Sequence, residues 1–173
     1  MNIAEIKKCD IANGPGVRVS LFVSGCTHHC PGCFNEIAWN FDYGNPFTDE
    51  IQQELLTALA PSYIRGLTLL GGEPLERVNQ QGLLPFLKKV KKIYPEKDIW
   101  CYTGYRFEED VAGRMLQQWD ETKELLPMID VLVDGRFQEQ FKDIRLRFRG
   151  SSNQRLIDLK QTLQKGEIIL WDD

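Results

Sequence analysis

The sequence contains no apolar run that approaches the roughly 20 residues needed to cross a membrane. Its opening stretch, "MNIAEIKKCD", also lacks the apolar segment of a secretory signal peptide. We therefore expect a cytoplasmic protein with no membrane partner.

An excess of positive charge is missing as well. The chain has 21 basic and 25 acidic residues and a formal net charge of −4, so no global positive field exists to hold nucleic acid. We expect no direct nucleic-acid partner. No serine or histidine motif of a hydrolase is present. The length of 173 residues with 42% hydrophobic residues predicts one globular domain, residues 1–173.

Cysteine is present in an odd number, five residues, which argues against a disulfide framework in a reducing compartment. Clustered cysteines there indicate metal ligands or reactive thiols. Three of them fall in "SGCTHHCPGC", residues 24–33, together with His28 and His29. The isolated Cys9 and Cys101 are predicted to be buried small apolar residues.

Strand and helix patterns alternate along the chain. Residues 17–23, "VRVSLFV", alternate apolar and polar side chains and predict a strand that ends just before the cysteine loop. A helix is expected after Thr48, which suits an N-cap, and another from about Leu83. A helix is also predicted in "FEEDVAGRMLQQW", and strands in "GLTLLGGEP", "DIWCYTG", "MIDVLVDG", "RLIDLK" and "EIILW". This order predicts right-handed β-α units and a largely parallel sheet, with the chemistry at the carboxyl ends of its strands.

The cysteine loop is compatible with two kinds of metal centre. A zinc ion needs four tetrahedral ligands, which the three cysteines and His28 or His29 could supply in a strained loop. An iron–sulfur cube could instead take three thiolates on three irons and leave the fourth iron open to a ligand. Gly25 and Gly32 suit a tight loop that needs positive φ angles and close backbone approach.

Further motifs extend the pattern beyond the cysteines. The spacing Cys26, Cys30, Cys33 after the first strand, with "GGEP" at 71–74 after a later one, resembles the radical S-adenosylmethionine superfamily. "NGPGVRVSLFVSGC", "CPGCFN", "DIWCYTGY", "DVLVDGRF" and "RGSSNQR" narrow the resemblance to the activating proteins of the anaerobic ribonucleoside-triphosphate reductase, over about residues 10–160. The position before the third cysteine is Gly32, whereas many members of the superfamily have an aromatic residue there that contacts adenine.

The resemblance implies an α/β radical SAM fold, a partial open (β/α)6-type barrel of about six parallel strands. It also implies one [4Fe-4S] cluster, held by Cys26, Cys30 and Cys33, that reductively cleaves S-adenosylmethionine to methionine and a 5′-deoxyadenosyl radical. That radical would take a hydrogen atom from a backbone glycine of the large reductase subunit. A flavodoxin or ferredoxin is expected as electron donor. The alternatives are an activase of another glycyl-radical enzyme, such as pyruvate formate-lyase, and a non-catalytic zinc-stabilised binding module.

The resemblance also implies which residues contact S-adenosylmethionine. Gly71 and Gly72 would let the main chain approach its amino group, and Glu73 would accept a hydrogen bond there. The backbone of Gly32, Cys33 and Phe34 would lie over the cluster and the adenosine. Other candidates also have ordinary structural explanations; they are Asp130 and Asp134 for ribose hydroxyls, Arg149 and Arg155 for a substrate carboxylate, and Tyr102 and Tyr105 at the mouth of the site. His28 and His29 are expected to be unremarkable loop residues.

Overall fold

The computed structural model describes residues 1–172, and residue 173, the end of the predicted domain, lies outside them. The chain forms a seven-stranded mixed sheet with the order β3-β1-β2-β4-β5-β6-β7. The strands are β1 Asn2–Asp10, β2 Val17–Val23, β3 Asn45–Pro46, β4 Ile64–Gly71, β5 Asp98–Tyr102, β6 Val131–Asp134 and β7 Arg155–Asp158.

The middle of the sheet is parallel and its two edges are antiparallel. Strands β2, β4, β5 and β6 run in parallel, whereas β1 pairs antiparallel with β2 and β3, and β7 with β6. The prediction of about six parallel strands is therefore wrong, since the described residues form four parallel strands. "EIILW" is not a strand either, because among the described residues it contributes an isolated bridge from Leu170 to Ile157.

Helices cover the sheet and connect its parallel strands. They are α1 Asp49–Leu59, α2 Arg77–Ile93, α3 Leu116–Gln118, α4 Asp120–Leu125 and α5 Leu159–Lys165, with a π-helix at Phe107–Met115 and 3-10 turns at Glu36–Trp39, Leu126–Met128 and Glu139–Phe141. The Thr48 side chain accepts a hydrogen bond from the Ile51 N–H and caps α1, as predicted. Helix α2 begins at Arg77, before the expected Leu83.

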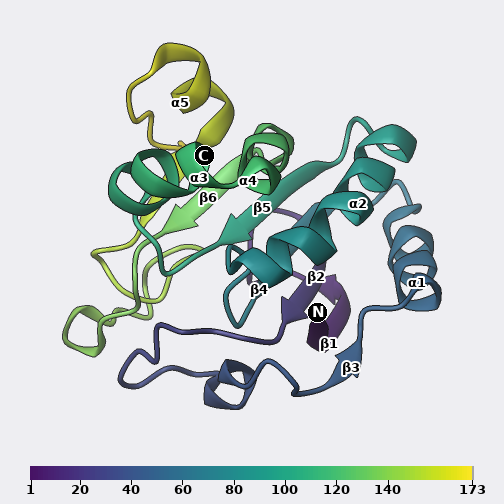
Figure 1. Ribbon diagram of the computed structural model, residues 1–173, viewed down its shortest axis with the longest axis horizontal. Coiled ribbons are helices and arrows are strands. Elements are labelled where there is room, and N and C mark those ends of the chain that lie inside the picture. The colour runs from purple at the N-terminus through teal and green to yellow at the C-terminus, as the bar shows by residue number, and fades with distance from the viewer. Residues whose placement is uncertain (173) are drawn as a thin grey trace.

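The fold places the loops that follow β2, β4 and β5 at one edge of the sheet. Helices α1 and α2 lie over one face, and the cysteine loop lies beside the segment that follows β6, at the edge where the parallel strands end (Figure 1). Apolar residues from the strands and from α1, α2 and α5 form the main core between these layers. Within residues 1–172, no helix is both long and apolar enough to cross a membrane.

Candidate iron–sulfur and cofactor site

A cavity of about 440 Å³ opens at the carboxyl ends of β2, β4 and β5. This volume falls within the range of pockets that enclose small-molecule cofactors, roughly 300–1,000 Å³. The cavity lining includes all the residues that the resemblance assigns to the cluster and to S-adenosylmethionine: Cys26, Cys30, Gly32, Cys33, Phe34, Gly71, Gly72 and Glu73. Residues far apart in the chain thus meet at one place, because the ends of parallel strands share one edge of the sheet.

The cysteine loop leaves β2 and folds back over the strand ends. The N–H groups of Gly25 and Cys26 donate to the carbonyls of Ala38 and Trp39, at 2.8 and 3.1 Å, and fasten the start of the loop. Gly25 and Gly32 have φ angles of +97° and +73°, which confirms the predicted need for glycine at both positions. The loop therefore has a defined shape that presents Cys26, Cys30 and Cys33 to the cavity.

The three loop cysteines are free thiols, with Cys26 buried and Cys30 and Cys33 partly buried. Burial raises the pKa of Cys26 to about 12 and also raises that of Cys30. These thiols are thus protonated at neutral pH, and metal binding must displace the protons. Cys101 is buried as predicted, but the prediction for Cys9 is wrong, because this β1 residue is exposed.

The glycine pair at the end of β4 permits close packing against the cysteine loop. Gly71 has a φ of +110°. A Cβ atom at Gly72 would lie 2.6 Å from the Gly25 carbonyl oxygen, so a side chain there would displace the loop backbone. The N–H groups of Gly72 and Glu73 donate to the carbonyls of Val23 and Gly25, at 2.7 and 2.8 Å. Because neither glycine has a side chain, the backbone at the end of β4 can hydrogen-bond directly to the loop that carries the thiols.

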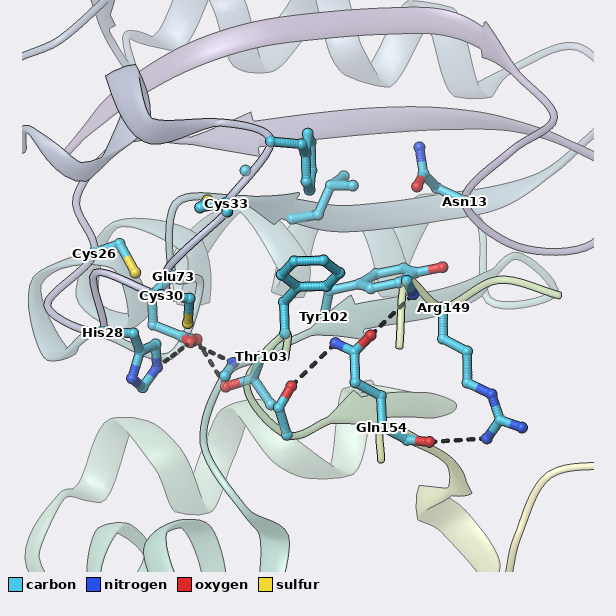
Figure 2. A pocket seen from close by; sticks show the side chains of 18 of the residues that line it. Asn13, Cys26, His28, Cys30, Cys33, Glu73, Tyr102, Thr103, Arg149 and Gln154 are labelled. Carbon is cyan, nitrogen blue, oxygen red and sulfur yellow. Dashed lines mark hydrogen bonds and ion pairs between the residues drawn. The ribbon is translucent and has the colours of Figure 1, made fainter. Parts of the chain in front are cut away.

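Glu73 is buried beside the cavity, with 1% of its surface exposed. One carboxylate oxygen accepts hydrogen bonds from the Leu75 N–H and the Thr103 hydroxyl, each at 2.8 Å. The other accepts from the Gly104 N–H and from His28 Nε2, also at 2.8 Å (Figure 2). The protein therefore fixes this carboxylate with donors from three separate segments.

The two histidines differ sharply, which corrects the expectation that both are unremarkable. The His28 side chain is 4% exposed and points to Glu73 (Figure 2). His29 is exposed and stacks on Trp39, with ring centroids 4.6 Å apart. Sequence reasoning did not assign Thr103 to the site; its sequence signal was its place near the end of the predicted strand "DIWCYTG", and the structure ends β5 one residue before it.

The far wall of the cavity comes from the segment between β6 and β7. Its lining residues in this segment are Gly135, Phe137, Lys142, Asp143, Ile144, Leu146, Phe148, Arg149, Gly150 and Gln154. Phe34 stands at the mouth with 82% of its surface exposed, and Tyr102 lines the wall and donates to the Phe148 carbonyl at 2.8 Å. Arg149 also lines the cavity and donates to the Gln154 carbonyl at 2.8 Å. Tyr105 lies behind the lining, where its ring meets the edge of His28.

Three charged candidates lie outside the cavity lining. Asp130 pairs with Lys91 and Lys160. Asp134 is buried and pairs with Arg155, which also binds Glu108. These residues have the ordinary structural roles that the sequence left open, and of the charged candidates Arg149 is the one at the cavity.

The Arg155–Glu108 pair predicts a pH-dependent contribution to stability. Hydrogen bonds from Arg155 lower the pKa of Glu108 from 4.5 to about 2. Because the folded-state pKa is lowered, the contribution is present above about pH 4.5 and is lost as the pH falls toward 2. Urea unfolding of Glu108→Gln should show a lower midpoint than the parent near neutral pH, and the difference should vanish in acid. Glu109→Gln is the control, since Glu109 is exposed and lies 4.0 Å from Arg106; an equal loss there would contradict the assignment.

The thiols and the cavity fit an iron–sulfur cluster. Three soft sulfur donors at one cavity suit iron–sulfide chemistry, and Cys26, Cys30 and Cys33 would hold three irons of a cube and leave the fourth without a protein ligand. A closed zinc site needs four ligands around one ion. Within residues 1–172, no three His, Cys, Asp or Glu side chains are grouped closely enough to hold a single ion.

Comparison with known proteins identifies the class. Residues 12–157 match the family model described as a 4Fe-4S single cluster domain. The chain is therefore a member of this family of iron–sulfur proteins.

Curated relatives narrow the family further. The chain is similar to the anaerobic ribonucleoside-triphosphate reductase-activating proteins of Pasteurella multocida (strain Pm70) and Escherichia coli (strain K12), with 45% and 40% identity. Each alignment covers 89% of this chain, with 95% and 96% of the respective relative. The protein of Enterobacteria phage T4 with the same name is 44% identical over 90% of this chain and 93% of its own. The chain belongs to the family of anaerobic ribonucleoside-triphosphate reductase-activating proteins.

Proposed function

We propose that this protein is a single-domain radical SAM activase that generates a glycyl radical on the large subunit of the anaerobic ribonucleoside-triphosphate reductase. The observation that carries the proposal is the meeting of three free cysteines with the Gly71–Glu73 strand end around one cavity. The names of the relatives, activating proteins of that reductase, indicate the reductase as the substrate. The five free cysteines suit a reducing cytoplasm.

Different segments of the chain would bind the cluster and S-adenosylmethionine. Cys26, Cys30 and Cys33 would hold a [4Fe-4S] cluster, and the main chain at Gly71 and Gly72 would bind the amino group of S-adenosylmethionine. When bound, the cluster supplies one electron that breaks a carbon–sulfur bond, which gives methionine and a 5′-deoxyadenosyl radical. Hydrogen transfer from a backbone glycine then yields 5′-deoxyadenosine and the glycyl radical.

The remaining cavity residues would shape the path of the substrate. The backbone of Gly32, Cys33 and Phe34 would lie along the adenosine, and the carboxylate of Glu73 would face the amino group from its fixed position. We further propose that the sheet corresponds to the partial open barrel of radical SAM proteins, since its parallel strands all end at the cavity. Its open side would admit a protein segment. A flavodoxin or ferredoxin would supply the electron.

Electron paramagnetic resonance provides the decisive test. Anaerobic incubation of the iron-loaded protein with the large reductase subunit, S-adenosylmethionine and dithionite should produce a glycyl radical and 5′-deoxyadenosine. Omission of S-adenosylmethionine should remove both. A radical on pyruvate formate-lyase but none on the reductase would reassign the substrate, and failure of the loaded protein to cleave S-adenosylmethionine would reject the chemistry.

A further inference from the structure

His28 occupies a closed niche although it lies in a loop between two exposed residues. Its neighbours Thr27 and His29 are exposed, whereas the His28 side chain is 4% exposed. Its ring meets the Tyr105 ring edge-on, with centroids 4.3 Å apart. A Cβ atom at Gly104 would lie 2.5 Å from the imidazole, so the glycine makes the space that the ring fills. Gly104 and Tyr105 thus form a niche whose shape fits the His28 ring.

The niche brings His28 to a carboxylate whose other donors are all fixed by strand ends. Glu73 accepts from Leu75 on its own segment, and from Thr103 and Gly104 after β5. Among the four donors, His28 alone comes from the cysteine loop, with Nε2 donating at 2.8 Å. The contact therefore joins the loop that carries the thiols to the residue that faces the amino-acid end of the proposed cofactor site.

The same residue lies two positions after Cys26, a proposed cluster ligand. Both side chains line the cavity, and the side chain of His28 also reaches Glu73. A shift of this part of the loop would therefore change the position of Cys26 relative to Glu73. The ring of His29, one position further along the loop, stacks on Trp39 instead.

We propose that His28 is a positioning residue that locks the cysteine loop to the Glu73 carboxylate and thereby sets the distance between the cluster and the amino-acid end of S-adenosylmethionine. This inference rests on the proposed function. The imidazole also borders the cavity, and it acts there through its hydrogen bond to Glu73. The positioning role also explains why the loop contains a buried histidine between two cysteines that face the cavity.

The test compares two side chains of equal length. His28→Gln retains an N–H donor for Glu73, whereas His28→Met removes it, and His29→Met is the control on the same loop. All variants are loaded anaerobically, and iron and sulfide are measured per chain. Binding of S-adenosylmethionine is then measured at equilibrium, together with the change it causes in the spectrum of the reduced cluster.

We expect His28→Met to bind S-adenosylmethionine about 10- to 100-fold more weakly, the range for loss of a hydrogen bond to a charged group. Its cofactor-induced spectral change should be altered while its iron content stays at the parental level. His28→Gln and His29→Met should stay within about threefold of the parent in affinity.

Three outcomes would overturn the assignment of His28: parental affinity in His28→Met, equal weakening in His28→Gln, or loss of iron in both His28 variants. The proposed function fails in a different way, since the parent protein itself would then neither form the cluster nor cleave S-adenosylmethionine.

Discussion

Single replacement of Cys26, Cys30 or Cys33 by serine is expected to abolish cluster assembly and, with it, cleavage of S-adenosylmethionine. Serine preserves the size of the side chain but replaces a soft sulfur ligand with a hard oxygen, which binds iron–sulfide centres poorly. The loss of affinity for the cluster should exceed about 100-fold, because changes to residues that merely support a ligand already cost 10- to 100-fold. Iron, sulfide and visible absorbance after anaerobic reconstitution provide the measurement.

The chain offers its own control for this experiment. Cys9 is an exposed residue of β1 and does not line the cavity, so Cys9→Ser should keep parental iron content and activity. A loop variant that retains full iron would remove that cysteine from the ligand set. A colourless parent protein that contains one zinc ion and does not cleave S-adenosylmethionine would instead favour the zinc-stabilised binding module.

The second large effect concerns stability and lies away from the cavity. Arg18 on β2 is fully buried, and its guanidinium pairs with Asp98 at 2.6 Å. It also donates to the Thr68 hydroxyl at 2.7 Å and to the Leu67 carbonyl at 2.9 Å, and it packs on the Trp100 ring. Arg18→Met should lower the free energy of unfolding by about 3 kcal/mol, because it removes one member of a buried ion pair and leaves the Thr68 hydroxyl and the Leu67 carbonyl without this donor.

The same carboxylate provides the matched comparison. Arg65 also pairs with Asp98, at 3.0 Å, but its side chain is 57% exposed. Arg65→Met should therefore cost less than about 1 kcal/mol. Urea unfolding of the metal-free chain measures the loss in the free energy of unfolding for each variant. Equal costs would show that the buried guanidinium adds nothing beyond a surface ion pair.

The sequence could predict those elements whose signals are local. Strand β2 alternates apolar and polar side chains from Val17 to Leu21, and Thr48 caps α1 as its side-chain chemistry predicts. The position of the site also followed from the sequence, since loops after parallel strands must meet at one edge. Strand β1 escaped prediction because its pairing with β2 is irregular between Ile3 and Glu5 and again between Lys7 and Asp10, which disrupts the period of two.

The remaining errors depend on contacts between distant segments. A parallel return from β6 to β7 would need a crossover connection of a dozen or more residues, usually a helix. Residues 135–154 form no such helix, only the short turn Glu139–Phe141 and an isolated bridge between Lys142 and Ser151, and β7 pairs antiparallel with β6. The burial of His28 could not be predicted from the sequence of its own loop either, because Gly104 and Tyr105, which form the niche, follow another strand.

The separation of the cysteine loop from the main core has a consequence for how the protein matures. The buried residues of that core include none between residues 24 and 46, so we expect the sheet and its helices to fold before any iron is present. Zinc fingers behave differently, since their metal-free chains are unfolded. We therefore expect that a cluster could be inserted into the folded chain, and replaced after its loss, without synthesis of a new chain.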